Sequence, residues 1–220
     1  MSIKTAFKKD KLIHLGKTLK YSLHVIFRPF DGFWDLTHEK RGSMGAATII
    51  FALVILTQAW TFTYSSVVFY PIQWEYFNLI MQIIPTIVLF SIWCISNWSL
   101  TTLMDGKGRL GQIYMGTAYA LTPYVIINLP LIAISHLLTV EESSYYTIAT
   151  QISTIWCVIL ILSAMMMIHD YSLGKAVFSS LLAIVGMMII IFLLVMFFSL
   201  ITQSFGYFVS LYKEIAFRLY

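Results

Sequence analysis

The sequence has little charge: only 11% of its 220 residues are Asp, Glu, Lys or Arg, whereas 59% are hydrophobic. Soluble globular domains carry about 25% charged residues, so this chain lacks the charge needed to cover a globule in water. The shortage is concentrated in five stretches without any charged residue, which are residues 42–74, 76–104, 110–140, 143–169 and 176–212. Each stretch exceeds the roughly 20 residues that a helix needs to cross a bilayer.

We therefore expect an all-α, polytopic membrane protein. Its five transmembrane helices are predicted near residues 46–69, 79–103, 112–138, 147–168 and 181–208. A membrane β-barrel is excluded, because its strands would appear as short segments of alternating polarity rather than as unbroken apolar runs. The predicted domains are a cytosolic segment at 1–43, a membrane domain at 44–212 and a short external tail at 213–220.

Two further scarcities limit the function. Cysteine occurs twice, and Cys94 and Cys157 both fall inside predicted spans, which indicates buried free thiols rather than a disulfide framework. No acidic or basic residue lies in the middle of a predicted span, although such residues are the usual marks of ion-coupled transport. We expect no active transport by this chain alone, no enzyme activity, no cofactor and no nucleic-acid partner.

The distribution of basic residues predicts the orientation in the membrane. Nine of the 14 Lys and Arg residues precede the first predicted span. Lys107 and Arg109 lie in the second connection and Lys175 in the fourth, whereas the first and third connections have none. Because basic residues are retained in the cytoplasm, the N-terminus is predicted inside and the C-terminus outside. Lys213 and Arg218, in the external tail, run against this trend.

The N-terminal segment has the pattern of a basic amphipathic helix. Its apolar residues recur at intervals of three and four, namely Leu12, Leu15, Leu19, Leu23 and Ile26. The opposite side carries Lys17, Tyr21, His24 and Arg28. Pro29 is expected to stop this helix. Such a helix can lie in the inner interface, attracted by anionic lipid; the alternative is a cytosolic helix packed on loops or on a partner.

The stretch that follows, "RPFDGFWDLTHEKRGS", is rich in aromatic residues. Phe30, Phe33 and Trp34 occur at helical spacing, and aromatic rings favour the headgroup level of a bilayer. Phe33 and Trp34 are therefore predicted to contact lipid or a partner. The pair His38 and Glu39 lacks the further ligands of a zinc site, so no metal is expected there.

Proline and amide residues interrupt the predicted second and third spans. These are Pro85, Asn97, Pro123, Asn128 and Pro130. Static bends joined by interhelical hydrogen bonds are the favoured interpretation, since polar groups in lipid seek partners on neighbouring helices. The alternative is a passive permease whose path, between the kinked second and third helices, is lined by Gln82, Asn97, Thr122 and Asn128.

The stretch "DGKGRLG", residues 105–111, has the G-x-G-x-x-G spacing of a dinucleotide site, with Lys107 between the first two glycines. A dinucleotide site needs a preceding strand and a later acidic residue, and both are missing here, so no nucleotide is expected. Gly106, Gly108 and Gly111 are predicted instead to permit a tight cytoplasmic reversal, with Asp105 accepting from the amides of Gly106 and Gly108.

The charged residues at this face allow two other interpretations. Lys107 and Arg109 are placed to touch lipid headgroups. Asp105 and Asp170 both end spans on the cytoplasmic face, so a metal-bridging carboxylate pair is conceivable. Two carboxylates without a clustered His or a further acid make a poor catalytic site, so the enzyme hypothesis is disfavoured.

One region carries a family resemblance. The stretch "NWSLTTLMDGKGRLGQIYMGTAYALTPY", residues 97–124, resembles the Yip-domain family of Ypt/Rab-interacting membrane proteins, in particular its bacterial branch. "RPFDGFWDLTHEKRGS" is similar to that branch's entry into its first span. The resemblance extends over essentially the whole chain and implies five spans, a cytosolic N-terminus and a non-enzymatic scaffold.

The resemblance implies partners only in outline. Eukaryotic relatives engage small GTPases and trafficking factors, but their acidic-Tyr-Gly-Pro motif is absent here. Bacterial relatives are associated with carbohydrate ABC transporters, which implies an accessory role in the bacterial plasma membrane. The expected partners are membrane lipid and either ABC transporter subunits or a second copy of the chain. Candidate contact residues are Asp105, Gly106, Lys107, Gly108 and Arg109.

Overall fold

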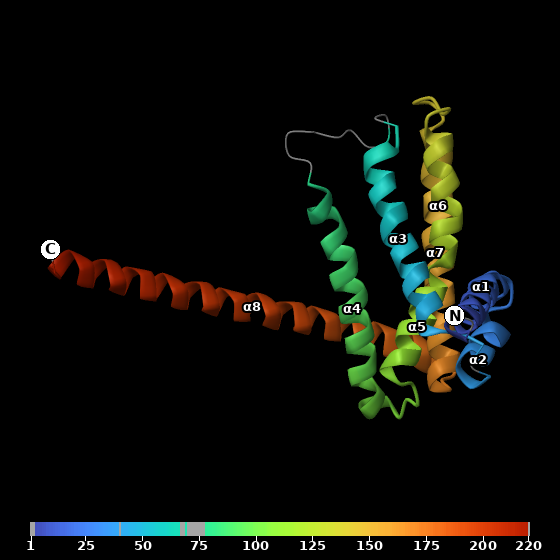
Figure 1. Cartoon of the computed structure of the whole chain (residues 1–220), viewed down its shortest axis with the longest axis horizontal. Helices are drawn as coiled ribbons and strands as arrows, with labels where there is room; N and C mark the ends of the chain where they lie inside the picture. The colour runs from blue at the N-terminus through green and yellow to red at the C-terminus, as the bar shows by residue number, and fades with distance from the viewer. Residues whose placement is uncertain (1–2, 40, 67–68, 70–77, 220) are drawn as a thin grey trace.

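The computed structural model describes residues 3–39, 41–66, 69 and 78–219, and those residues form an all-helical fold (Figure 1). The helices are α1 (Ile3–Phe27), α2 (Pro29–His38), α3 (Met44–Tyr64), α4 (Leu79–Met104), α5 (Leu110–Ala120), α6 (Thr122–Ser135), α7 (Ser143–His169) and α8 (Leu173–Leu219). Five stretches among them are long and apolar enough to cross a membrane: α3, α4, α5 with α6, α7, and α8. The predicted fold class is thereby confirmed. The predicted end of the first span, near residue 69, adjoins residues 67–68 and 70–77, which lie outside the described residues.

The core of the bundle lies where α3, α5 and α7 meet. Small side chains are buried there, including Ala46, Ala118 and Ala164, each with no exposed surface. Small residues let membrane helices approach closely, which strengthens van der Waals packing. Tyr119 of α5 is also fully buried, and its hydroxyl donates to the carbonyl of Thr18 at 3.2 Å. This bond ties α1 to the bundle.

The third span is interrupted, although the sequence predicted one helix across 112–138. The chain forms α5 up to Ala120 and a second helix, α6, from Thr122. Pro123 has no N–H to donate and sits in the first turn of α6, where that donor is not needed. Pro130 and Pro85 remain inside α6 and α4, so of the three prolines predicted to interrupt the second and third spans, Pro123 alone lies at a helix boundary.

Helix α8 differs from the predicted fifth span in length and direction. It has 47 residues, about 70 Å at the usual rise of a helix, whereas residues 181–208 were expected. It runs across the direction of α3, α4, α6 and α7 and leaves the bundle (Figure 1). Its first part packs on α4, where the Ser96 hydroxyl donates to the carbonyl of Ala183 at 2.7 Å. Residues 191–215 are exposed throughout.

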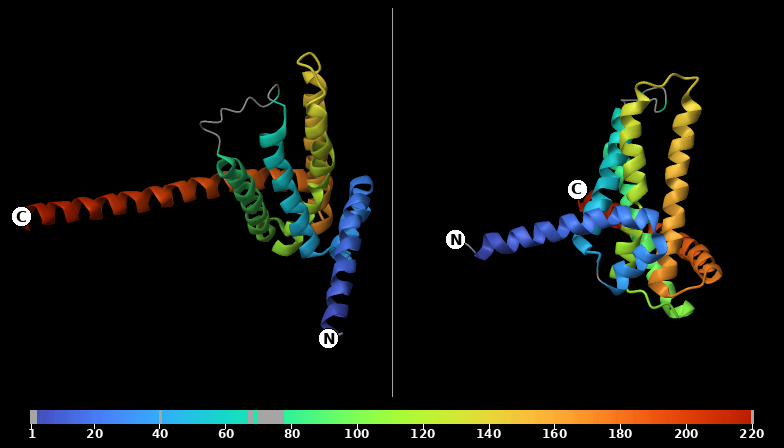
Figure 2. Two further views of the ribbon diagram at one scale, coloured as in Figure 1. Left: turned by 45° about the horizontal axis from the view of Figure 1, so that its top comes forward. Right: turned by 90° about the vertical axis from the view of Figure 1, so that its right-hand side faces the viewer.

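Helix α1 also lies across the bundle direction, beside α2 (Figure 2). It ends at Phe27, and Pro29 begins α2 rather than continuing α1, as the proline predicted. Its buried face is formed by Thr18, Ser22 and Val25, whereas Leu23 is 46% exposed. The predicted apolar face is therefore only partly the inward one. The hydroxyls of Thr18 and Ser22 donate to backbone carbonyls within α1, which lowers the cost of burying them.

Candidate functional site

The loop between α4 and α5 packs against the turn between α7 and α8. We call these two segments, residues 105–111 and 169–175, the loop junction. Lys107 and Asp170 join them directly, with 2.8 Å between Lys Nζ and Asp Oδ2. The contact links positions 63 residues apart in the chain, so the "DGKGRLG" stretch is not an isolated hairpin.

Two helices end at the loop junction in the same way. Asp105 follows α4 and Asp170 follows α7, and both adopt the left-handed conformation, with φ of 54° and 56°. The next residues close each helix: the amide of Gly106 donates to Thr101 at 2.9 Å, and that of Tyr171 donates to Met166 at 3.0 Å. This is the Schellman pattern, in which Asp takes a place that usually belongs to glycine because its short polar side chain tolerates φ > 0.

The glycines of the loop are required for close approach rather than for backbone angles. Among the described glycines none has a positive φ. A Cβ on Gly106 would lie 2.5 Å from the Tyr171 hydroxyl, and one on Gly108 would lie 2.6 Å from the ring of His169. The nearest atom to a Cβ on Gly111 would be 3.9 Å away, so Gly111 has room. The prediction that these glycines supply special backbone angles for the chain reversal is therefore wrong; Gly106 and Gly108 are needed for close packing instead.

The buried imidazole of His169 organises the loop. The amide of Gly108 donates to His169 Nδ1 at 3.3 Å, and the ring stacks on Tyr171 with 5.0 Å between centroids. Since Nδ1 accepts, the neutral ring carries its proton on Nε2. His169 Nε2 is buried and has no hydrogen-bond partner among the described residues. The amides of Gly106 and Gly108 thus have acceptors other than the predicted carboxylate of Asp105.

Lys107, Asp170 and Lys175 of the loop junction have partners within the chain. The hydrogen bond to Asp170 raises the pKa of Lys107, although the lysine side chain is 75% exposed and the pair is well screened. Lys175 lies over the ring of Tyr171, 4.7 Å from its centroid. Burial, and then the negative charge of Asp105, raise the pKa of Tyr171. The tyrosine therefore stays protonated under physiological conditions and packs as an aromatic surface between His169 and Lys175.

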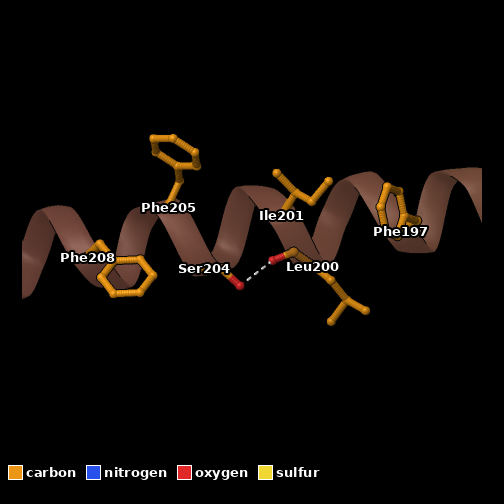
Figure 3. A pocket seen from close by; sticks show the side chains of 6 residues that line it. All are labelled: Phe197, Leu200, Ile201, Ser204, Phe205 and Phe208. Carbon is orange, nitrogen blue, oxygen red and sulfur yellow. Dashed lines mark hydrogen bonds between the residues drawn. The ribbon is translucent and has the colours of Figure 1, made fainter.

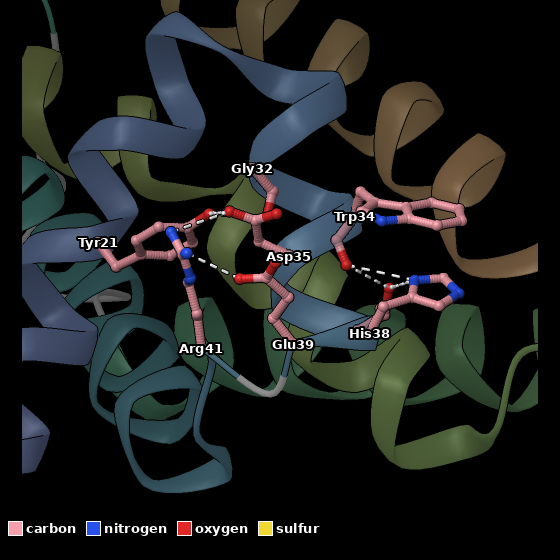
Figure 4. Close-up of polar contacts among 8 residues, drawn as sticks. Tyr21, Gly32, Trp34, Asp35, His38, Glu39 and Arg41 are labelled. Carbon is pink, nitrogen blue, oxygen red and sulfur yellow. Dashed lines mark hydrogen bonds and ion pairs between the residues drawn. The ribbon is translucent and has the colours of Figure 1, made fainter.

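The remaining predicted contact residues divide into buried and exposed ones. Arg109 is exposed at the start of α5, and its backbone N–H donates to Gln112 Oε1 at 2.9 Å. Trp34 is 45% exposed and stacks on His38, with 3.7 Å between ring centroids (Figure 4). Phe33 has no exposed surface. It belongs to the core and cannot meet lipid or a partner in this structure, because its position on α2 faces the bundle.

A second polar cluster, not anticipated from the sequence, joins α1, α2 and the segment after α2 (Figure 4). Arg41 contacts Asp35 at 3.1 Å and Glu39 at 2.7 Å. The hydroxyl of Tyr21 donates to Asp35 at 3.1 Å and to the carbonyl of Gly32 at 3.4 Å. Partial burial and the Asp35 carboxylate raise the pKa of Tyr21 to about 12. Helical spacing alone could not reveal this cluster, since Tyr21 and Arg41 are brought together by the turn at Pro29.

The intramembrane amides act mainly within the bundle. Asn128 of α6 donates to the Ser153 hydroxyl of α7 and to the Tyr124 carbonyl, each at 2.9 Å. Thr122 donates to the carbonyl of Tyr119 at 2.7 Å. Asn97 is buried, and its Nδ2 has no partner among the described residues. Gln82 is exposed on α4. Of the four residues predicted to line a permease path, three are buried and Gln82 is exposed, and Asn128 joins two helices.

The structure gives no support to the carboxylate-pair site. Asp170 is engaged by Lys107, and Asp105 is exposed at the end of α4. Within the described part of the chain, no group of three or more His, Cys, Asp or Glu side chains could hold a metal ion. A catalytic metal centre thus has no candidate ligand set in that part.

The helical bundle and the packed loop junction define a multi-pass membrane protein. The model of the Yip1 domain matches residues 23–196, and the chain belongs to the Yip1 family. The match begins within α1, includes the whole α4–α5 loop and ends inside α8, so the resemblance of residues 97–124 is confirmed. No curated protein and no solved structure matches the chain.

Proposed function

We propose that this protein is a non-enzymatic accessory component of the bacterial plasma membrane that binds a membrane-protein partner. The observation that carries this proposal is the outer half of α8, residues 191–215, which are exposed along their whole length. Among them Phe192, Phe197, Phe198 and Phe205 are each about 60% exposed or more. Exposed apolar surface on this scale marks contact with lipid or with another protein.

The same stretch has the face needed for a helical partner. Phe197, Leu200, Ile201, Ser204, Phe205 and Phe208 line a shallow apolar depression along α8 (Figure 3). The Ser204 hydroxyl donates to the carbonyl of Leu200 at 2.9 Å, so its hydrogen-bonding capacity is met within the helix. A partner helix can pack on such a face without having to satisfy a polar group.

The loop junction is the second proposed contact surface. Its backbone is held against α7 by the Gly108–His169 bond, and the exposed Lys107–Asp170 pair joins its two segments. Arg109 is exposed at its edge and has no ion pair among those the structure describes. A preorganised surface loses little conformational entropy on binding. The family resemblance points to subunits of a carbohydrate ABC transporter as the partner class, with a second copy of this chain as the alternative.

Co-purification in mild detergent tests this function. The tagged wild-type chain is expected to retain a membrane-protein partner in constant proportion, either transporter subunits or its own copy. Arg109→Glu is expected to weaken that association, because it reverses the charge of an exposed residue. Arg218→Glu, beyond the proposed contact stretch 191–215 of α8, is the control with the same change of charge. A chain that always purifies alone and monomeric contradicts the proposal.

The proposed orientation places the N-terminus in the cytoplasm and the C-terminus outside. Cys94 and Cys157 are buried, at 4% and 5% exposure, so a thiol reagent will report mainly on introduced cysteines. With a membrane-impermeant maleimide on intact cells, Val140→Cys and Tyr212→Cys are expected to react, and Gly16→Cys only after lysis. Labelling of Gly16→Cys on intact cells would reverse the orientation.

A further inference from the structure

A basic depression lies where α1 meets the segment that follows α2. It has a volume of about 350 Å³ and is lined by Lys17, Lys20, Tyr21, His24 and Arg41. We call it the basic pocket. Four of its residues come from α1 at positions 17, 20, 21 and 24, a spacing that places them on one face of the helix. Arg41 completes the pocket from a separate segment.

The two lysines supply the unneutralised positive charge. Lys17 and Lys20 are exposed, and neither has an ion pair among the described residues. Asp35 and Glu39 are the carboxylates close to the pocket, and both contact Arg41. An anion that enters the pocket therefore finds Lys17 and Lys20 free to bind it.

The carboxylates of Asp35 and Glu39 hold the Arg41 side chain at the edge of the pocket. Asp35 accepts from Arg41 on one side and from the Tyr21 hydroxyl on the other, at 3.1 Å in both cases (Figure 4). Glu39 holds the second terminal nitrogen of Arg41 at 2.7 Å. The guanidinium is thus held in place beside α1, so a ligand does not have to order it. Preorganisation of this kind favours a ligand with a compact charged group.

The surroundings of the basic pocket favour a lipid rather than a free ion. Leu23 and Phe27 follow the lysines on an adjoining strip of α1 and are 46% and 82% exposed. Helix α1 lies across the direction of the bundle helices, which is the orientation expected of a helix that lies in the membrane interface (Figure 2). Apolar side chains next to cations on such a helix fit the acyl chains and the headgroup of one lipid.

We propose that the basic pocket binds the phosphate of an anionic phospholipid headgroup through Lys17 and Lys20, with Leu23 and Phe27 against the acyl chains. A lipid headgroup and free inorganic phosphate would both present a phosphate to the pocket, and we assign the phosphate to a membrane lipid. The inference goes beyond partner binding, since the pocket lies on α1 whereas the proposed partner surfaces are the loop junction and α8. Lys17 and Lys20 also precede residue 23, where the match to the Yip1 domain begins.

Native mass spectrometry of the full chain in detergent tests the proposal. Phosphatidylglycerol, phosphatidylcholine and inorganic phosphate are added separately to the wild-type chain and to Lys17→Gln/Lys20→Gln. The wild type is expected to bind phosphatidylglycerol in preference to phosphatidylcholine. The double variant is expected to lose roughly 30-fold in affinity for phosphatidylglycerol, because two basic residues at about 1 kcal/mol each are removed and about 1.4 kcal/mol corresponds to tenfold.

Two further variants separate the sources of binding. Lys213→Gln/Arg218→Gln removes the same charge at the far end of α8 and is expected to bind phosphatidylglycerol as the wild type does. Phe27→Ser is expected to weaken phosphatidylglycerol binding and to leave inorganic phosphate unaffected. Equal binding by wild type and Lys17→Gln/Lys20→Gln overturns the proposal. Inorganic phosphate bound as tightly as phosphatidylglycerol overturns the assignment to a lipid.

Discussion

The loop junction and the outer half of α8 differ in where their interaction partners come from. The loop junction is polar and glycine-rich, and the chain itself supplies acceptors for the Gly106 and Gly108 amides and a carboxylate for Lys107. Residues 191–215 of α8 are mostly apolar, with no charged residue before Lys213, and all of them are exposed. The first region forms most of its polar contacts within one molecule and leaves Arg109 exposed for a partner, whereas the second needs lipid or another molecule along its whole surface.

The two regions therefore contribute to the structure in different ways. The junction fixes the relation between α4, α5, α7 and α8, because its contacts link two connections that are distant in sequence. The outer part of α8 makes no specific contact with the rest of the chain. Its largely apolar surface is instead typical of a helix in a membrane. Substitutions in the two regions should therefore fail in different ways.

The largest effect is expected from a charge in the middle of α8. Leu194→Lys divides the charge-free run at 176–212 into two segments of 18 residues, each below the roughly 20 residues typical of a spanning helix. A lysine at the centre of a spanning helix costs about 3 kcal/mol of insertion free energy, so membrane integration of α8 should fall strongly. Phe217→Lys, outside that run, is the matched control. A glycosylation or protease-protection reporter at the C-terminus measures the change, and equal integration of both variants would mean that α8 is not embedded.

The next largest effect is expected at the loop junction. Gly108→Ala places a Cβ 2.6 Å from both His169 and Ile168, so the loop must move away from α7. Overpacking of this kind typically destabilises by about 1–3 kcal/mol. Gly174→Ala is the control, because a Cβ there meets nothing within 4 Å. Thermal unfolding in detergent should show a lower Tm for the first variant alone; an unchanged Tm for Gly108→Ala would contradict the close approach.

A smaller effect is expected for the bond between α6 and α7. Asn128→Leu removes the donor to Ser153, and hydrogen bonds between membrane helices contribute about 0.6–2 kcal/mol. A double-mutant cycle with Ser153→Ala isolates that contribution from the loss of packing. Since Asn128 acts as a structural link, solute permeability of reconstituted vesicles should not change. Permeability that depends on Asn128 would revive the permease hypothesis.

The smallest effect concerns Tyr21 at alkaline pH. Its pKa is raised to about 12 in the folded chain, above the unfolded value of about 10, so folding favours the protonated phenol. The resulting stabilisation is complete below about pH 10 and is lost as the pH rises towards about 12. Tyr21→Phe should remove that part of the pH dependence, as measured by denaturant unfolding between those values. Parallel pH profiles of the two proteins would show that Tyr21 does not contribute.

The sequence predicted the elements of the fold well and their arrangement poorly. Charge-free runs located the membrane helices, because the bilayer demands about 20 apolar residues from each span. The break at Pro123 was foreseen only as a kink, since hydropathy does not show where a helix ends. The direction of α8 was not predictable, because a helix that is apolar all round carries no pattern to orient it. Phe33 was predicted to contact lipid or a partner, because spacing alone does not tell which face of a short helix meets the protein.

The position of the candidate site could be predicted from the sequence, but the residues that the loop packs against could not. The glycines and Lys107 identified residues 105–111, but their partners, His169 and Tyr171, lie more than 50 residues later. Only the packing of α4, α5 and α7 brings them together. The sequence signal that could have identified them is the "HDY" stretch at the end of α7, where Asp170 repeats the position of Asp105 after α4.

Site-specific photo-cross-linking tests the central claim most directly. A photoreactive amino acid replaces Arg109 at the loop junction or, as the control, Val140 in the loop at the other end of the bundle, which is 69% exposed. We expect irradiation of intact membranes to give one discrete protein adduct from position 109, with a transporter subunit or a second copy of this chain, and none from position 140. Adducts of equal yield at both positions, or none at position 109, would contradict the assignment of the loop junction as a partner-binding surface.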